Sequence, residues 1–137
     1  MVKVLITGAA GYLGSTLTEV LLEKGYSVDA LDNLMYEQTS LLHLCSNKNF
    51  RFVNTDVTNF KFLKSIIPTY DVIIPLAAIV GGPACDKNKE LATKVNFEQI
   101  KCIVDNITTE QKLIMPNTNS QYGSSSEVIT EDSPFNP

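Results

Sequence analysis

The sequence lacks the residue patterns of several protein classes. It has no tryptophan, a single histidine and three cysteines, with no Cys-x-x-Cys pair and no histidine near a cysteine in a zinc-site pattern. The odd number and wide spacing of Cys45, Cys85 and Cys102 indicate reduced thiols instead of a disulfide framework. His43 has no catalytic or metal partner implied by spacing, so we expect a surface or packing role. These features favour a cytoplasmic protein without a bound metal.

Positive charge and long apolar runs are also scarce. The chain has 11 Lys and Arg against 15 Asp and Glu, a net charge of −4, and its basic residues form no cluster. This balance argues against a nucleic acid or an anionic membrane as partner. The longest apolar run, residues 72–80, is interrupted by Pro75 and falls far short of the roughly 20 residues that span a bilayer. The N-terminus does not resemble a signal peptide.

What the sequence does contain is an alternation of strand-like and helix-like segments. With 137 residues and 44% hydrophobic content, we expect one domain with one core. Short apolar runs predict strands at 2–6, 28–31, 50–53, 72–76 and 113–115. Helical spacing of apolar residues predicts helices over 13–24, 60–67 and, less regularly, 92–107. This order favours an α/β fold with a doubly wound parallel sheet of the Rossmann type, covered by helices on both faces.

A glycine-rich turn joins the first strand to the first helix. In the segment Thr7–Gly14, Gly8 suits the tight turn, Gly11 a close approach to a phosphate, and Gly14 close packing of the helix. A turn of this kind leaves backbone N–H groups and the positive end of the helix dipole facing a pyrophosphate. Because glycine-rich turns that bind nothing are common, the motif alone does not decide between the two interpretations.

Asp32 supplies the context for a dinucleotide site. It ends the second apolar run, about 20 residues after the glycine turn, where a carboxylate hydrogen-bonds the adenosine ribose hydroxyls in dinucleotide-binding folds. A carboxylate there would repel a 2′-phosphate, which favours NAD over NADP. The alternative is that Asp32-Asn33 is only a solvated turn after a strand.

Several short motifs in a fixed order point to one family. In chain order they are Thr7–Gly14, Asp32-Asn33-Leu34, Asp56-Val57, Leu76-Ala77-Ala78, Asn96, Gln121-Tyr122-Gly123 and Glu131-Asp132-Ser133-Pro134. Over essentially its whole length the chain resembles the extended short-chain dehydrogenases/reductases, also called NAD-dependent epimerases/dehydratases, which act mainly on nucleotide sugars.

The resemblance implies a set of cofactor-binding residues. Asp56 would contact the adenine amino group with Val57 beside the ring, and the Ala77-Ala78 backbone would line the path to the nicotinamide. From the residues alone, Asp56 could equally be a helix N-cap and the alanines close packing. The full set implied to bind NAD is Gly8, Gly11, Tyr12, Leu13, Gly14, Asp32, Asn33, Asp56, Val57, Leu76, Ala77, Ala78 and Asn96.

The resemblance implies only part of the catalytic machinery. Thr118, upstream of the Tyr122-Gly123 pair, matches the hydroxyl residue that bonds the reacting sugar oxygen. The Tyr-x-x-x-Lys pair that supplies the acid/base tyrosine in this family is absent from the 137 residues, and Tyr122 matches the Tyr-Gly turn instead. We therefore expect an incomplete NAD-binding domain over residues 1–137, the N-terminal part of an enzyme without its substrate-binding part.

The sequence departs from the family pattern in two places, and the second departure favours epimerase or ketoreductase chemistry over dehydration. Pro75 stands where the family often has His, so a donor near the cofactor is lost. Asn119-Ser120 follow Thr118 where dehydratases have Asp-Glu, and an amide and a hydroxyl are poor substitutes for an acid that protonates a leaving group. The loop 81–86 would face the substrate, or be merely a flexible connection.

We accordingly expect the NAD-binding part of a nucleotide-sugar epimerase or ketoreductase that transfers hydride at a sugar carbon. The alternative is a noncatalytic dinucleotide-binding or redox-sensing module, which the absence of Tyr-x-x-x-Lys favours. A chain with an exposed strand edge would also self-associate, so a homo-oligomer is a further expectation.

Overall fold

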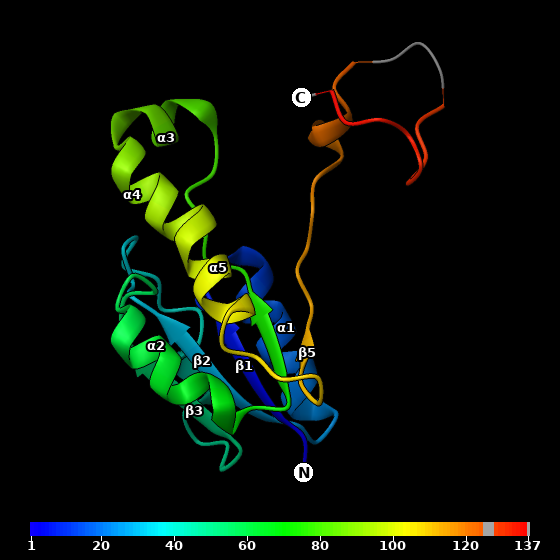
Figure 1. Ribbon diagram of the computed structural model, residues 1–137. Helices are drawn as coiled ribbons and strands as arrows, with labels where there is room; N and C mark the ends of the chain where they lie inside the picture. The colour runs from blue at the N-terminus through cyan, green and yellow to red at the C-terminus, as the bar shows by residue number, and fades with distance from the viewer. Residues whose placement is uncertain (125–127, 137) are drawn as a thin grey trace.

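Five parallel strands form the centre of the molecule. The computed structural model describes residues 1–124 and 128–136. The strands are β1 (Lys3–Thr7), β2 (Ser27–Asp32), β3 (Phe50–Asn54), β4 (Val72–Pro75) and β5 (Lys112–Leu113), in the spatial order β3-β2-β1-β4-β5 (Figure 1). From β1 the chain adds β2 and β3 on one side, and it then crosses over to add β4 and β5 on the other side of β1. The strand order therefore reverses beside β1. The doubly wound parallel sheet expected from the sequence is confirmed.

Helices connect the strands. The α-helices are α1 (Tyr12–Glu23), α2 (Phe60–Ile66), α3 (Gly82–Lys87), α4 (Lys89–Thr93) and α5 (Gln99–Val104), and a π-helical turn, Lys94–Glu98, joins α4 to α5. Short 3-10 helices lie at Leu42–Leu44, Ile67–Thr69 and Asn119–Tyr122. Among the described residues, no helix has the length and apolar character needed to cross a membrane.

The sheet separates two apolar clusters. Alternate residues of β1 point to opposite faces, as the pleat requires: Val4 and Ile6 join the cluster on the α1 side, and Leu5 joins the cluster that contains Leu63 of α2 and Ile103 of α5. β1 is therefore apolar on both faces, which is why residues 4–6 read as a continuous apolar run in the sequence. Figure 1 shows α1 on one side of the sheet and α2 with α5 on the other.

Three predicted segments differ from those observed. The predicted helix 92–107 begins at Lys89 and is divided by the π-helical turn. Residues 82–87, expected as loop, form α3, whose first turn contains Pro83, a residue suited to a helix start. The strand expected at 113–115 is Lys112–Leu113, and Ile114 and Met115 are both 53% exposed. After β5 the chain leaves the sheet and extends away from it (Figure 1).

Candidate functional site

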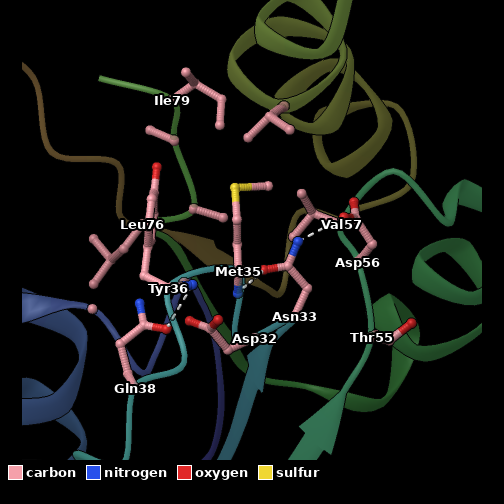
Figure 2. Close-up of a pocket in the computed structure, with 15 residues that line it drawn as sticks. Asp32, Asn33, Met35, Tyr36, Gln38, Thr55, Asp56, Val57, Leu76 and Ile79 are labelled. Carbon is pink, nitrogen blue, oxygen red and sulfur yellow. Dashed lines mark hydrogen bonds between the residues drawn. The ribbon is translucent and has the colours of Figure 1, made fainter. Parts of the chain in front are cut away.

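A cleft lies at the carboxyl edge of the sheet, beside the point where the strand order reverses. Ligands of open α/β sheets bind at this position. Five segments that are far apart in the sequence meet there, and Figure 2 shows their side chains around the cleft. The lining residues are Gly8, Gly11, Asp32, Asn33, Met35, Tyr36, Gln38, Thr55, Asp56, Val57, Leu76, Ala77, Ala78, Ile79 and Val95.

The glycine-rich turn forms the floor of the cleft. Gly8 has φ +68°, and a Cβ there would lie 2.5 Å from the backbone nitrogen of Ala77. Both its conformation and its contact with the segment after β4 therefore require glycine. A Cβ on Gly11 would meet only the carbonyl oxygen of Gly8, at 3.2 Å, and Gly11 lines the cleft. Gly11 thus leaves open space where a larger side chain would project.

The first turn of α1 presents free backbone donors to this space. The N–H groups that precede it are already bonded: Ala9 donates to the carbonyl of Leu31, Ala10 to the Asp32 carboxylate, and Gly11 to the carbonyl of Gly8. Gly11 is the N-cap and supplies no side-chain acceptor to the helix. The N–H groups of the first helical turn have no partner among the hydrogen bonds that the described residues form, and with the positive end of the helix dipole they make a site suited to a phosphate.

The carboxylate of Asp32 is held rigidly at the cleft. Asp32 is 7% exposed, and its oxygens accept hydrogen bonds from the backbone N–H of Ala10 (2.9 Å) and of Leu34 (2.8 Å). This burial rules out the interpretation of Asp32 as part of a merely solvated turn. A carboxylate has about four lone-pair directions, so acceptor capacity remains for ligand hydroxyl groups.

Asn33 and Asp56 are bonded to each other across the cleft. The Asn33 amide donates to Asp56 Oδ2 at 2.7 Å, and Asp56 Oδ1 accepts from the N–H and hydroxyl of Thr58. Burial raises the pKa of Asp56, but the bonds from Thr58 and Asn33 outweigh it, so the net pKa is lowered. The alternative interpretation of Asp56 as the N-cap of α2 is wrong, because Asn59 caps that helix.

The segment after β4 forms the opposite wall. Pro75 remains in register with Thr7 of β1, so the strand geometry is kept at this position. Leu76, Ala77, Ala78 and Ile79 then line the cleft. The packing interpretation of the alanines also has support, since Ala77 touches Gly8 and packs against the α2–α5 cluster.

Five residues of the predicted set do not line the cleft. Tyr12 is 98% exposed and Leu13 53% exposed, and neither lines the cleft. A Cβ on Gly14 would lie 2.5 Å from the carbonyl oxygen of Gly8, so Gly14 packs the helix against its own turn. Asn96 instead holds the backbone of Ile79, through bonds to its N–H and its carbonyl, both 2.8 Å.

Thr118 is the fifth of these residues. It lies beyond β5, where its hydroxyl accepts a hydrogen bond from the N–H of Ser120. The structure does not bring this proposed catalytic hydroxyl to the cleft.

Sequence reasoning missed other lining residues. Met35, Tyr36 and Gln38 follow Asp32 in a loop, and the side chain of Met35 extends into the cleft (Figure 2). No periodicity marks loop residues, so only their closeness to Asp32 in the sequence could have pointed to them. Thr55 precedes Asp56 and could have been found in the same way. Ile79 and Val95 read as ordinary core positions.

The strand order, the glycine-rich turn and the position of the cleft define a Rossmann-type α/β domain. A profile of the NAD dependent epimerase/dehydratase family matches residues 4–137. The chain belongs to this family, and the resemblance seen in the sequence is confirmed.

Named relatives agree with this assignment. The chain is 33% identical to a UDP-glucuronate 4-epimerase of Thermodesulfobacterium geofontis, over 93% of this chain and 43% of the relative. It is 30% identical to a UDP-N-acetyl-alpha-D-glucosaminuronate decarboxylase of Bacillus cytotoxicus, over 95% of this chain and 40% of that protein. The chain therefore spans about two fifths of the length of these relatives.

Solved structures share the fold. A UDP-glucuronic acid 4-epimerase from Bacillus cereus, in complex with UDP-glucuronic acid and NAD, has a TM-score of 0.86 and 28% identity, over 98% of this chain and 46% of that chain. A UDP-Glc/GlcNAc 4-epimerase from Campylobacter jejuni has a TM-score of 0.87 and 26% identity, over 100% of this chain and 44% of that chain.

Proposed function

We propose that the cleft binds NAD, with the adenosine ribose at Asp32. The observation that carries this proposal is the meeting of the glycine turn, Asp32, Asp56 and the segment after β4 in one cleft at the carboxyl edge of the sheet. Asp32 has spare acceptor capacity for the two ribose hydroxyls, and its negative charge disfavours the 2′-phosphate of NADP. The residues present therefore fit the cofactor that the family name states.

The rest of the cleft fits the remaining parts of the same molecule. The pyrophosphate would lie over Gly11, at the first turn of α1, where no Cβ occupies the space and backbone donors are free. Adenine would lie beside Asp56 and Val57, and the nicotinamide end would follow the backbone of Leu76–Ala78. The family resemblance implies these positions, and the order of the lining segments around the cleft supports them.

We further propose that the protein serves hydride transfer at a sugar carbon of a nucleotide sugar, as an epimerase or a ketoreductase. When bound, NAD would accept or return the hydride, while the chain's own residues orient it and Thr118 bonds the reacting hydroxyl. The relatives named for UDP-sugar chemistry support this substrate class. In that case Thr118 must come nearer to the cleft than its observed position beyond β5.

A second candidate function is noncatalytic dinucleotide binding. It is favoured by the position of Thr118 outside the cleft. Both candidates require the same NAD site. They differ in whether a nucleotide sugar changes the redox state of the bound NAD in a protein that also carries Tyr-x-x-x-Lys, which absorbance at the NADH wavelength measures.

The test of NAD binding compares NAD with NADP by calorimetric titration. We expect NAD to bind at least about tenfold more tightly, because Asp32 repels a 2′-phosphate. Asp32→Asn should reduce this preference. Asp71→Asn is the matched control: this exposed carboxylate, which bonds the N–H of Lys3, precedes β4 at the opposite edge of the sheet, so the preference should persist. Equal binding of both nucleotides by the unaltered protein would exclude the proposed role of Asp32.

A further inference from the structure

Gln99 is a fully buried amide that hydrogen-bonds the sheet edge beside the cleft and the helical turn before it. It is 0% exposed at the start of α5. Its Oε1 accepts from the hydroxyl of Thr7 at 2.8 Å, and its Nε2 donates to the carbonyls of Ala77 at 3.1 Å and Val95 at 2.8 Å. An amide with no exposed surface is held by its partners, because an unmet hydrogen bond there would be costly.

These bonds enclose the backbone of Ala77. Its carbonyl is held by Gln99, and its N–H points to the hydroxyl of Thr7 at 3.4 Å, while Thr7 in turn donates to Gln99. The three groups form a closed network between the end of β1, the segment after β4 and the helix. Ala77 is also the residue that a Cβ on Gly8 would strike. Displacement of Ala77 would therefore alter both the wall and the floor of the cleft.

Asn96, which holds the backbone of Ile79, lies within the π-helical turn Lys94–Glu98, and Gln99 directly follows that turn. The two amides thus fix alternate residues of the wall, Ala77 and Ile79. A π-helical turn widens the helix by one residue per turn and often marks a functional position. Here the turn lies beside the segment that the two amides hold.

We propose that Gln99 is a positioning residue that holds the Ala77 wall in the conformation that receives the nicotinamide half of NAD. This inference rests on the proposed function, which puts NAD in the cleft. Gln99 does not line the cleft, so it acts through Ala77 and not by touching the ligand. The adenosine half of the cleft, at Asp32 and Asp56, has no hydrogen bond to Gln99 among those that the described residues form.

The test is the affinity of Gln99→Met for NAD and for AMP, measured by calorimetry. Methionine keeps the length and helix-forming character of the side chain but donates and accepts no comparable hydrogen bonds. We expect NAD to bind about tenfold more weakly, because binding must now order the wall, while AMP affinity changes less than about twofold. A loss of stability alone would not change the ratio of the two affinities.

Gln111→Met is the matched control. Gln111 lies just before β5, at the edge of the sheet opposite the cleft. Its amide donates to the carbonyls of Ile67 and Tyr70. This variant should lower the melting temperature and leave the ratio of NAD to AMP affinity unchanged. An unchanged ratio in Gln99→Met, or equal weakening of both ligands, would overturn the role of Gln99. Failure of the unaltered protein to bind NAD would instead overturn the proposed function itself.

Discussion

The contact between Gly8 and Ala77 can be tested by adding one methyl group. Gly8→Ala places a Cβ 2.5 Å from the Ala77 nitrogen, 2.7 Å from its Cα and 2.8 Å from the Leu76 carbonyl carbon. All three atoms are backbone, so no side chain can rotate away. The substitution also puts alanine at φ +68°, a conformation that L-residues rarely adopt.

The expected destabilisation is the sum of two effects. The left-handed conformation costs alanine about 1–2 kcal/mol, and overpacking against fixed neighbours typically costs about 1–3 kcal/mol. Together they predict a loss of roughly 2–5 kcal/mol, which is a large fraction of the roughly 5–15 kcal/mol that stabilises a typical domain. The protein should remain folded at low temperature but unfold at a much lower denaturant concentration.

Two other glycines separate these effects. Gly25 has φ +84° with no atom within 4 Å of an added Cβ, so Gly25→Ala should show only the conformational loss of about 1–2 kcal/mol. Gly82 has neither a positive φ nor a close neighbour, so Gly82→Ala should be neutral or stabilising by up to about 1 kcal/mol.

The assay is urea unfolding followed by circular dichroism for the unaltered protein and the three variants. The expected order of stability is Gly82→Ala, then Gly25→Ala, then Gly8→Ala. If Gly8→Ala were no less stable than Gly25→Ala, the close approach of the Ala77 segment to the glycine turn would be refuted.

Further outcomes are expected from the same structure. Gly11→Val should abolish NAD binding while the circular dichroism spectrum stays unchanged, since the added side chain projects into the cleft; normal binding by a folded variant would remove the turn from the site. The lowered pKa of Asp56 stabilises the fold at neutral pH, so the advantage of the unaltered protein over Asp56→Asn in urea unfolding should be constant above about pH 5 and decline as the pH falls below the ordinary carboxyl pKa toward the lowered one; an advantage that does not decline over that range would contradict the hydrogen bonds from Thr58 and Asn33. The 137-residue protein should self-associate in light scattering, because β5 pairs only with β4 among the described strands and exposed apolar side chains lie on and around it, and a monomer would refute this expectation. It should also show no epimerase or reductase turnover with nucleotide sugars, because no Tyr-x-x-x-Lys is present; turnover lost in Thr118→Ala would show that another residue, with Tyr122 first, supplies the acid/base group.

The central strand β1 could be predicted because it is buried on both faces. Val4, Leu5 and Ile6 pack on opposite clusters, so the run is apolar without interruption, and turn residues bound it. The predicted β1, β2, β3 and β4 each lie within two residues of their observed bounds. The end of β5 could not be predicted, because Ile114 and Met115 continue the apolar pattern and Ile114 still donates its N–H to the carbonyl of Ile73, although the paired register ends at Leu113 and both side chains are 53% exposed.

The long helix shows why periodicity fails at the wall of the cleft. The apolar positions 92–107 repeat irregularly because a π-helical turn shifts their register between Val95 and Ile103, and a sequence pattern cannot distinguish such a shift from a weak helix. Gln99 was missed for a related reason. A glutamine in a helix normally faces solvent, and only the tertiary contacts to Thr7 and Ala77 reveal that it is buried.

The cleft itself was predictable in outline. The glycine turn, Asp32, Asp56 and Ala77-Ala78 each follow a strand, and parallel strands end at the same edge of a sheet, so their meeting follows from the topology. Thr118 also follows a strand but does not reach the cleft, because the chain continues away from the sheet after β5.

The most direct test of NAD binding in this cleft is a crystal structure of the protein soaked with NAD. We predict the adenosine ribose hydroxyls within about 2.6–3.2 Å of the Asp32 carboxylate oxygens and the pyrophosphate over Gly11 at the first turn of α1. A nucleotide bound elsewhere, or a cleft that stays free of nucleotide at saturating NAD, would contradict the proposed function.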